Sequence, residues 1–396
     1  MCAMAEYKLS EVKKAVEGHF QKAAELSCYL REHPELPDQE FESSRRMVEV
    51  LEDAGFEVTY PYAGYETAFH ALFDNGDGPE VAILTEYDAL PEIGHGCGHN
   101  LHGSLSVLTG LALKDLKDCY KGKVHVIGTP AEEENGAKIG MSAQGIFDNM
   151  SLAMMMHSWS GGKCRADMDA LSLRCYFVEF YGQAAHAVAA PWEGKSALAA
   201  ARKFMDLIDA RRECFTPDVH VNSIVVEGGK APNIIPDYVK LRMEFRTATM
   251  KSMGAVDEMV KKCADGAAMA LDCTVKFTTV FEFADMVRNM TLEEEVIDRF
   301  ESFGMPTTGV EAASGSSDVG NVSYHCPAIQ PLLAITDEDY ALHTEAFRDA
   351  TALPQAEKAM ENGACILSLM ALKIFNDEEF RNKVYAEFQE QVEKRK

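Results

Sequence analysis

EYDALPEIGHGCGHNLHG (residues 86–103) is the stretch from which the architecture of this chain is best read. It follows an apolar run at 81–84 that is typical of a β-strand, and it leads into a segment whose leucines recur at helical spacing between Leu101 and Leu116. In open α/β sheets, the loop between a strand and the following helix is where ligands bind. Because this loop carries an Asp, a Cys and three His, we expect it to form part of a functional site.

Two later strands are predicted to end in the same way. KVHVIG (123–128) runs into TPAEEENG, and LAMMM (152–156) runs directly into His157. Cys97 and His99 flank a single glycine, so both side chains can reach the same ion. Each group alone has an ordinary explanation as a small, hydrogen-bonded or solvated residue. Their joint position at three strand ends predicts a metal site at one rim of the sheet.

The order of elements predicts two domains, as does the length of 396 residues. Strands alternate with helices in the first part, which indicates a mixed, largely parallel sheet sandwiched by helices. The middle part has the order βαββαβ of a ferredoxin-like α+β domain. Its expected elements are strands at 171–181, 219–227, 237–247 and 273–281, with helices at 194–212 and 252–269. We therefore expect a catalytic, metal-binding domain at 1–168 and 285–396, interrupted by an inserted lid or dimerisation domain at 169–284.

Charge, hydropathy and cysteine content limit the classes of partner and the cellular location that we expect. The formal net charge of −25 disfavours nucleic acid and anionic membranes as partners. No apolar run approaches the roughly 20 residues that span a bilayer, and the N-terminus lacks the apolar segment of a signal peptide. The 11 cysteines form no disulfide pattern, which favours reduced thiols and a cytoplasmic location.

The motifs resemble those of the aminoacylase/carboxypeptidase family of di-metal amidohydrolases, in the branch of auxin-conjugate hydrolases and p-aminobenzoyl-glutamate hydrolase. The resemblance extends over nearly the whole chain. It is carried, in order, by REHPELPDQE, DALP, GHGCGHN, PAEE, His157, GQAAHA, GGKAPNIIPD, EFR, GSSDVGNVS and the late HTE. It implies a zinc-peptidase-like catalytic domain with an inserted dimerisation domain.

The resemblance also implies roles for individual residues. It makes Cys97 the bridge between two divalent metal ions, zinc or manganese. The other ligands that it implies are His99, Glu133, His157 and His343. Glu132 matches the general base, and Asp88 matches an acidic residue that orients the metal site through one of its ligands. Since Glu134 stands where a glycine is common, the assignment of base and ligand between Glu132 and Glu133 stays open.

Three residues of the inserted domain match groups that act on the substrate. His186 matches a residue that reaches the partner subunit's site and stabilises an oxyanion, which implies a homodimer. Asn233 and Arg246 match substrate-holding groups, with Arg246 pairing with a carboxylate. Asp318 is balanced between capping a helix and acting in the site, and His95 and His102 are expected to be structural or to support the ligands.

We therefore predict a metal-dependent amidohydrolase that cleaves N-acyl amino acids or dipeptides with a free carboxylate. Two alternatives remain open. One is a catalytically silent binding or regulatory subunit with the same fold. The other is a thiol hydrolase with Cys97 as nucleophile.

Overall fold

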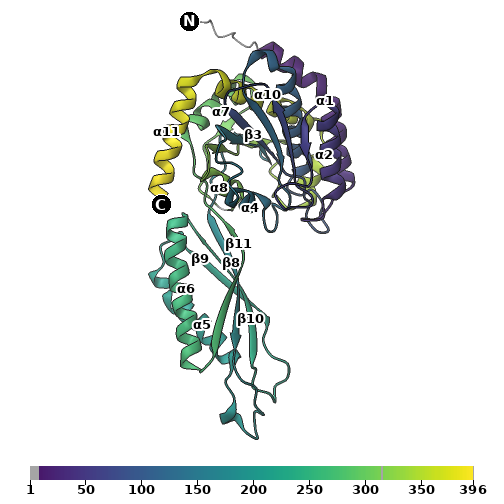
Figure 1. Ribbon diagram of the computed structural model, residues 1–396. Helices are drawn as coiled ribbons and strands as arrows, with labels where there is room; N and C mark the ends of the chain where they lie inside the picture. The colour runs from purple at the N-terminus through teal and green to yellow at the C-terminus, as the bar shows by residue number, and fades with distance from the viewer. Residues whose placement is uncertain (1–8, 314, 396) are drawn as a thin grey trace. The chain divides into compact units, whose positions relative to one another are not determined.

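The computed structural model describes residues 9–313 and 315–395, and in it the chain forms two compact units (Figure 1). The first unit contains the residues up to Asp169 together with Met286–Ala312 and Asp318–Lys394. The second is built around Ala170–Asp285. The second unit is therefore inserted into the sequence of the first.

The first unit contains a mixed sheet with the strand order β1-β2-β4-β3-β5-β13. Its strands are β1 (Glu57–Thr59), β2 (Phe69–Asp74), β3 (Glu80–Thr85), β4 (Lys123–Gly128), β5 (Leu152–Met154) and β13 (Ala328–Ile329). The pairs β4·β3, β3·β5 and β5·β13 are parallel, and the pairs made by β2 are antiparallel. Strands β3 and β4 are buried along almost their whole length, as expected for parallel strands covered on both faces.

Helices surround this sheet. They are α1 (Leu9–Glu32), α2 (Phe41–Asp53), α3 (His99–Asp115), α4 (Ala137–Ala143), α7 (Met290–Ser302), α8 (Val319–Ser323), α9 (Glu345–Ala350), α10 (Pro354–Asn376) and α11 (Glu378–Arg395). Helix α3 is almost entirely buried because it packs against α1 and α10 as well as on β3 and β4. Helices α1 and α2 lie on one side of this unit and α11 on the opposite side (Figure 1).

The first unit also contains a second, four-stranded sheet, and it shows that the single strand expected at 152–156 is partly wrong. Its strands are β6 (His157–Trp159), β7 (Cys164–Arg165), β12 (Thr307–Thr308) and β14 (Leu332–Ala334). The expected strand ends at Met154, and His157 begins β6 of the second sheet. The segment that pairs with it likewise passes from β13 in the first sheet to β14 in the second, and Pro331 lies at this change. Since proline has no N–H, it cannot continue the ladder, and only its carbonyl accepts a bond, from the N–H of His157 (2.9 Å).

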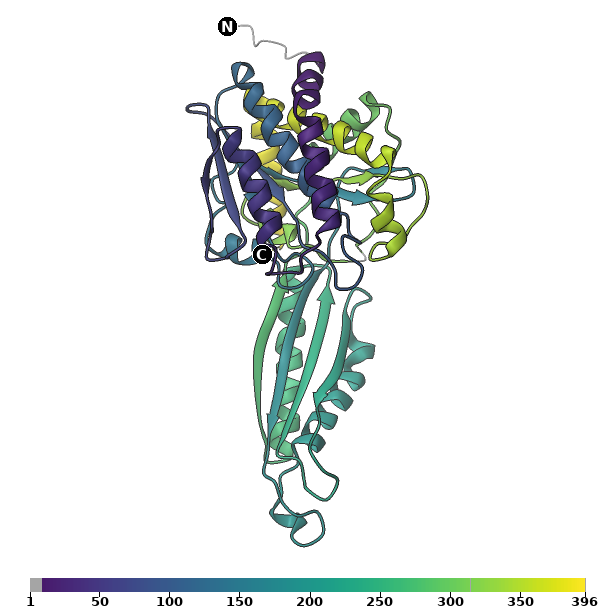
Figure 2. The same cartoon turned by 90° about the vertical axis from the view of Figure 1, so that its right-hand side faces the viewer.

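The second unit is a four-stranded antiparallel sheet with the order β11-β8-β10-β9. Its elements are β8 (Ser172–Tyr181), α5 (Ala197–Arg211), β9 (His220–Glu227), β10 (Tyr238–Thr247), α6 (Met250–Ala270) and β11 (Thr274–Phe283). Helices α5 and α6 pack on one face of the sheet, behind the strands in Figure 2. On β10, Val239, Leu241, Met243 and Phe245 are buried. The alternate residues, which include Arg246, therefore lie on the face without helices.

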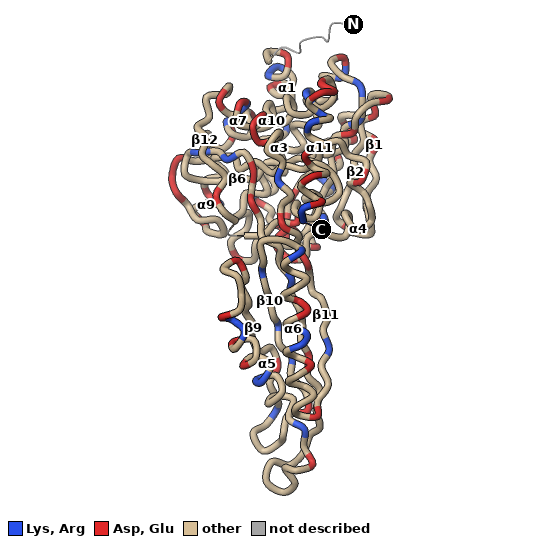
Figure 3. Tube along the Cα trace, turned by 90° about the vertical axis from the view of Figure 1, so that its left-hand side faces the viewer, with Lys and Arg blue, Asp and Glu red and all other residues tan. Residues whose placement is uncertain are grey.

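No helix within 9–313 or 315–395 combines the length and the apolar character needed to cross a membrane. Lys and Arg are dispersed among acidic residues along the traced chain (Figure 3).

Candidate metal centre

The first unit brings the proposed metal ligands together from distant parts of the chain. Cys97 lies just before α3, His99 begins α3, Glu133 follows β4, His157 begins β6 and His343 precedes α9. The ligand atoms of Cys97, Glu133 and His343 lie within 4.8 Å of one another, and so do those of His99, Glu132 and Glu133. The Sγ atom of Cys97 lies 3.3 Å from Nε2 of His157. The proposed ligands and the proposed base therefore form one cluster.

Hydrogen bonds determine which nitrogen of two histidines is free to bind a cation. Nδ1 of His99 lies 3.0 Å from the Oδ1 atom of Asp88, and Nδ1 of His157 lies 2.8 Å from the carbonyl oxygen of Ser158. Because a carboxylate and a carbonyl can only accept, each Nδ1 carries a proton, so in the neutral imidazole that binds a cation the free lone pair lies on Nε2. This is the arrangement by which a hydrogen-bonded acceptor orients a metal-binding imidazole.

The hydrogen bonding of two buried atoms in the cluster shows whether a cation fits there. Nε2 of His99 and Oε1 of Glu133 are buried and have no hydrogen-bond partner. Buried polar atoms are nearly always satisfied, so unpaired lone pairs that face one another need an occupant. A divalent cation satisfies both atoms, and the nitrogen, oxygen and sulfur donors suit Zn²⁺.

The protein alone places these groups in an unfavourable electrostatic environment. Burial raises the pKa of the Cys97 thiol well above its usual value, and Glu133 adds to the rise. Burial lowers the pKa of His157 to about 3. It also raises the pKa of Glu132 well above its usual value, with Glu86 and Glu133 contributing. A bound cation would reverse the effect on the thiol, because it stabilises thiolate and carboxylate forms.

His343 enters the cluster on a strained backbone. Its φ angle of 62° lies in the left-handed region, which is uncommon for a residue other than glycine. Its N–H donates to the carbonyl of Gly96 (2.9 Å), and its Nε2 lies 3.5 Å from Oε2 of Glu133. About half of its side chain is exposed (51%). His343 therefore lies on the open side of an otherwise buried cluster.

A buried lysine that the sequence did not single out lies beside the cluster. Nζ of Lys138, on α4, donates to Oε1 of Glu86 and to Oδ1 of Asp318, both at 2.6 Å, and all three side chains are fully buried. Although burial lowers the pKa of Lys138, Asp318 and Glu86 raise it further, so the ammonium stays charged. Asp318 thus pairs with a lysine, and its side chain makes no capping hydrogen bond to α8. Oxygen atoms of Glu86, Asp318 and Glu132 lie within 4.8 Å of one another.

His102 hydrogen-bonds to this network, and it also groups with Glu86, His99 and His157, whose ligand atoms lie within 4.8 Å of one another. Its Nδ1 accepts the N–H of Ser158 (3.2 Å), so the proton lies on Nε2, which donates to Oε2 of Glu86 (3.1 Å). Glu86 could have been noticed in the sequence as a charged residue directly after an apolar strand. A single lysine in a helical segment carries no such signal, so Lys138 could not.

His186 and Asn233 lie on neighbouring exposed loops of the second unit. The N–H of Ala187 donates to the carbonyl of Asn233 (2.9 Å). Nδ1 of His186 accepts the N–H groups of Val188 (3.2 Å) and Ala189 (3.1 Å). The imidazole is therefore held with its proton on Nε2, which leaves that atom free to donate a hydrogen bond.

Arg246 lies far from those two residues within the second unit. On β10, Tyr238 pairs with Tyr181, just before the His186 loop, whereas Arg246 pairs with Leu173 near the other end of β8. Eight residues of antiparallel strand correspond to roughly 27 Å. Nε of Arg246 donates to Glu244 (2.9 Å). Within one copy of the second unit, the proposed substrate-holding residues therefore do not form a single site.

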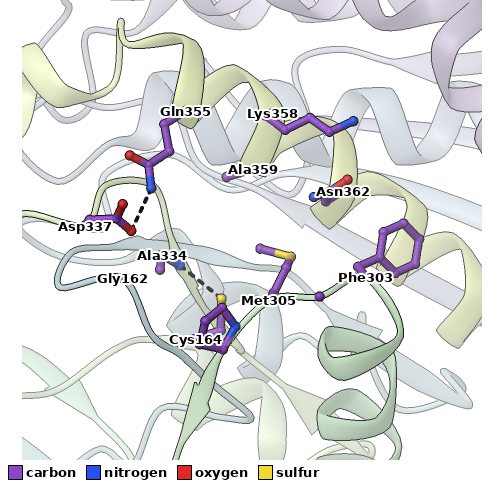
Figure 4. Close-up of a pocket in the computed structure, with 12 residues that line it drawn as sticks. Gly162, Cys164, Phe303, Met305, Ala334, Asp337, Gln355, Lys358, Ala359 and Asn362 are labelled. Carbon is purple, nitrogen blue, oxygen red and sulfur yellow. Dashed lines mark hydrogen bonds between the residues drawn. The ribbon is translucent and has the colours of Figure 1, made fainter.

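The first unit also has a separate cavity of about 190 Å³ (Figure 4). Phe303, Met305 and Cys164 lie on its wall, and Asp337 hydrogen-bonds to Gln355 at its edge. It contains none of the proposed ligands.

The chain resembles known proteins over most of its length. Residues 172–270 match the peptidase dimerisation domain family. The Xaa-Arg dipeptidase of Mus musculus is 32% identical, with 93% of this chain and 90% of that protein covered. One of the p-aminobenzoyl-glutamate hydrolase chains of Escherichia coli is 29% identical, covering 74% of this chain and 65% of that protein. A Bacillus subtilis structure described as a dinuclear metal binding peptidase from the M20 family superimposes with a TM-score of 0.69 at 21% identity, covering 90% of this chain and 99% of that one.

Proposed function

Because this chain belongs to the M20 family of peptidases, we propose that it hydrolyses the amide bond of N-acyl amino acids or dipeptides that carry a free carboxylate. The predicted family, the predicted α/β fold and the predicted hydrolysis of amide bonds are confirmed. The substrate class is our proposal. It follows the names of the relatives, a Xaa-Arg dipeptidase and a p-aminobenzoyl-glutamate hydrolase, both of which describe amides of amino acids.

We assign the binding of two divalent cations, zinc or manganese, to the clustered side chains. The proposed ligands are Cys97, His99, Glu133, His157 and His343. The single observation that carries this proposal is the pair of unpaired buried acceptors, Nε2 of His99 and Oε1 of Glu133, among further donor atoms. A thiolate favours zinc among the candidates. When bound, the cations would polarise the scissile carbonyl and lower the pKa of the attacking water.

Glu132 is our candidate for the general base. The turn after β4 presents it beside Glu133, but the two side chains have different surroundings. Both group with His99, but Glu133 also groups with Cys97 and His343, whereas Glu132 also groups with Glu86 and Asp318. This difference supports Glu133 as the ligand and Glu132 as the carboxylate that takes a proton from water and passes it to the leaving nitrogen.

We further propose a homodimer in which His186 of one chain serves the site of the other. Nε2 of His186 carries the proton and is free to donate, which suits an oxyanion. A dimer surface is supported by β9, an edge strand with exposed Ile224 (63%) and Val226 (52%), because unpaired apolar edges favour association. Asn233 and Arg246 are proposed to hold the substrate, with Arg246 exchanging Glu244 for the substrate carboxylate. We place this activity in the cytoplasm, in keeping with the free cysteines of the described chain.

The proposal can be tested with a panel of N-acyl amino acids and dipeptides, using enzyme loaded with Zn²⁺ or Mn²⁺. We expect release of a free amino acid that stops with a chelator and resumes when metal is added back. Activity that survives chelation, together with an acyl group attached to Cys97, would instead identify a thiol hydrolase. Metal binding without turnover of any member of the panel would support a silent binding protein.

The shared site has its own test. We expect Glu132→Gln and His186→Ala each to bind metal and to lose turnover. Mixed dimers of the two variants should regain up to about one quarter to one half of the wild-type rate, because one of the two sites then has both residues. If the mixture is as inactive as its components, the shared site is wrong.

A further inference from the structure

The segment between α1 and α2 (residues 33–40) connects the two loops that form the metal centre. The carbonyl of Glu35 accepts the N–H of Ala89, next to Asp88 (2.8 Å). On the other side, Oδ2 of Asp38 accepts the side-chain amide of Asn135 (3.0 Å). The sequence pattern of this segment indicates only a turn within a family motif. In the structure it ties the loop after β3 to the turn after β4.

Glu40 makes the most buried of these connections. Its side chain is fully buried, and its Oε1 accepts the N–H of Ala131 (2.9 Å) while its Oε2 accepts the hydroxyl of Thr67 (3.0 Å). Burial and the charge of Asp88 raise the pKa of Glu40 to about 7, against the effect of the two hydrogen bonds. Burying a carboxylate is costly unless it is hydrogen-bonded, and the bonds from Ala131 and Thr67 offset part of this cost.

Ala131 occupies a backbone conformation that needs such support. Its φ angle is 61°, in the left-handed region, and its Cβ makes this conformation unfavourable. Its carbonyl accepts the N–H groups of Gly136 (2.8 Å) and Glu134 (3.3 Å), which closes the turn. Glu132 and Glu133 follow Ala131 directly, so the conformation of Ala131 sets the direction in which the turn presents them.

We propose that Glu40 is a positioning residue for the hydrolysis reaction: it holds Ala131 in the left-handed conformation and thereby orients Glu132 and Glu133. This inference rests on the proposed function for the roles of those two glutamates. The hydrogen bonds of the Glu40 side chain go to Ala131 and Thr67, not to the proposed ligands. Glu40 acts through the backbone of one strained residue.

The test compares four forms of the full-length protein: wild type, Glu40→Ala, Ala131→Gly and the double variant. Zn²⁺ affinity is measured by competition with a chromophoric chelator, and kcat and KM with the substrate that the wild type cleaves fastest. Losing a buried hydrogen bond to a carboxylate should weaken Zn²⁺ binding and lower kcat by about tenfold to hundredfold in Glu40→Ala. KM should change by less than about threefold, because the substrate contacts remain.

Ala131→Gly supplies the readout that a purely structural role would not move. Glycine adopts positive φ without the Cβ penalty, so Ala131→Gly should raise both the Zn²⁺ affinity and kcat of Glu40→Ala by at least about threefold. In the wild-type background, where Glu40 already holds residue 131, the same substitution should raise either quantity by less than it does in Glu40→Ala. Glu40→Gln, which keeps an oxygen acceptor for Ala131, should stay within about threefold of the wild type.

Glu295→Ala is the matched control, because Glu295 is also buried in the first unit and pairs with Lys373 and Arg299, away from the centre. It should lower thermal stability without changing Zn²⁺ affinity. The inference is overturned if folded Glu40→Ala binds Zn²⁺ as tightly as the wild type. It is also overturned if Glu40→Ala merely loses stability, as Glu295→Ala does, and glycine at position 131 rescues nothing. A wild-type enzyme that binds neither Zn²⁺ nor Mn²⁺ would overturn the proposed function, and the inference with it, before any variant is compared.

Discussion

Replacing Asp88 by Asn probes how the protein prepares its ligands. Oδ1 of Asp88 accepts the Nδ1–H of His99, and Oδ2 accepts the backbone N–H of Glu133, both at 3.0 Å. Burial raises the pKa of Asp88, but the charge and hydrogen bond of His99 together with the N–H of Glu133 lower it, and the net effect is a pKa below the usual value. The carboxylate therefore stays ionised and accepts from two proposed ligands at once.

Asparagine can keep only one of these two bonds. Its amide nitrogen must face either the N–H of Glu133 or Nδ1 of His99. In the second orientation the proton of His99 moves to Nε2, the atom whose lone pair would bind the cation. Metal binding therefore requires the first orientation, which loses one charge-assisted hydrogen bond, about 1.5–3 kcal/mol. At about 1.4 kcal/mol per factor of ten, Zn²⁺ binding should weaken by roughly tenfold to hundredfold.

The assay is calorimetric titration of Zn²⁺ into metal-free wild type and Asp88→Asn near neutral pH. Asp115→Asn is the control, because Asp115 also pairs with a histidine, His19 (2.8 Å), but on the surface and away from the centre. Its Zn²⁺ affinity should stay within about twofold of the wild type. If folded Asp88→Asn binds Zn²⁺ with wild-type affinity, the proposed orientation of His99 by Asp88 is wrong.

Three further predictions concern stability and assembly. Lys138→Met removes the lysine that pairs with two buried carboxylates, and it should lower the free energy of unfolding in urea by about 3–5 kcal/mol. Lys358→Met, at an exposed lysine, should lower it by less than about 1 kcal/mol. Equal losses in the two variants would contradict the reasoning. Burial, with Glu293, raises the pKa of Asp167 to about 8, so the folded state holds this proton where the unfolded state has lost it, and stability falls as pH rises from about 4 to 8. The melting temperature of Asp167→Asn, relative to that of the wild type, should therefore be higher at pH 8 than at pH 5. A difference that does not depend on pH would count against this assignment. Ile224→Lys on the edge of β9 should produce monomers in sedimentation velocity and lose turnover, whereas an active monomer would refute the shared site.

Regular elements were the most predictable part of this protein. The strand expected at 171–181 is β8 (Ser172–Tyr181), and the helix expected at 252–269 is α6 (Met250–Ala270). Periodic burial dictates such elements, because a strand repeats every two residues and a helix every 3.6. The break after Met154 was not predicted, because it depends on Pro331, which is distant in the sequence and lies on the paired segment.

The candidate centre was predictable where its residues follow strands. Cys97, His99 and Glu133 could be found because the carboxyl ends of parallel strands meet at one edge of a sheet. Lys138 could not be found in this way, because it follows no strand and its partner Asp318 lies 180 residues away.

By itself, the sequence determined the order of elements, the rim at which the chemistry gathers and the types of side chain placed there, because these depend on local periodicity and on chain order. Only the tertiary structure decided which lone pairs are free. The protonated nitrogen of His99 depends on Asp88 and that of His102 on Ser158, which the fold brings next to them, and a proton's position follows from three-dimensional hydrogen bonding that no linear pattern encodes.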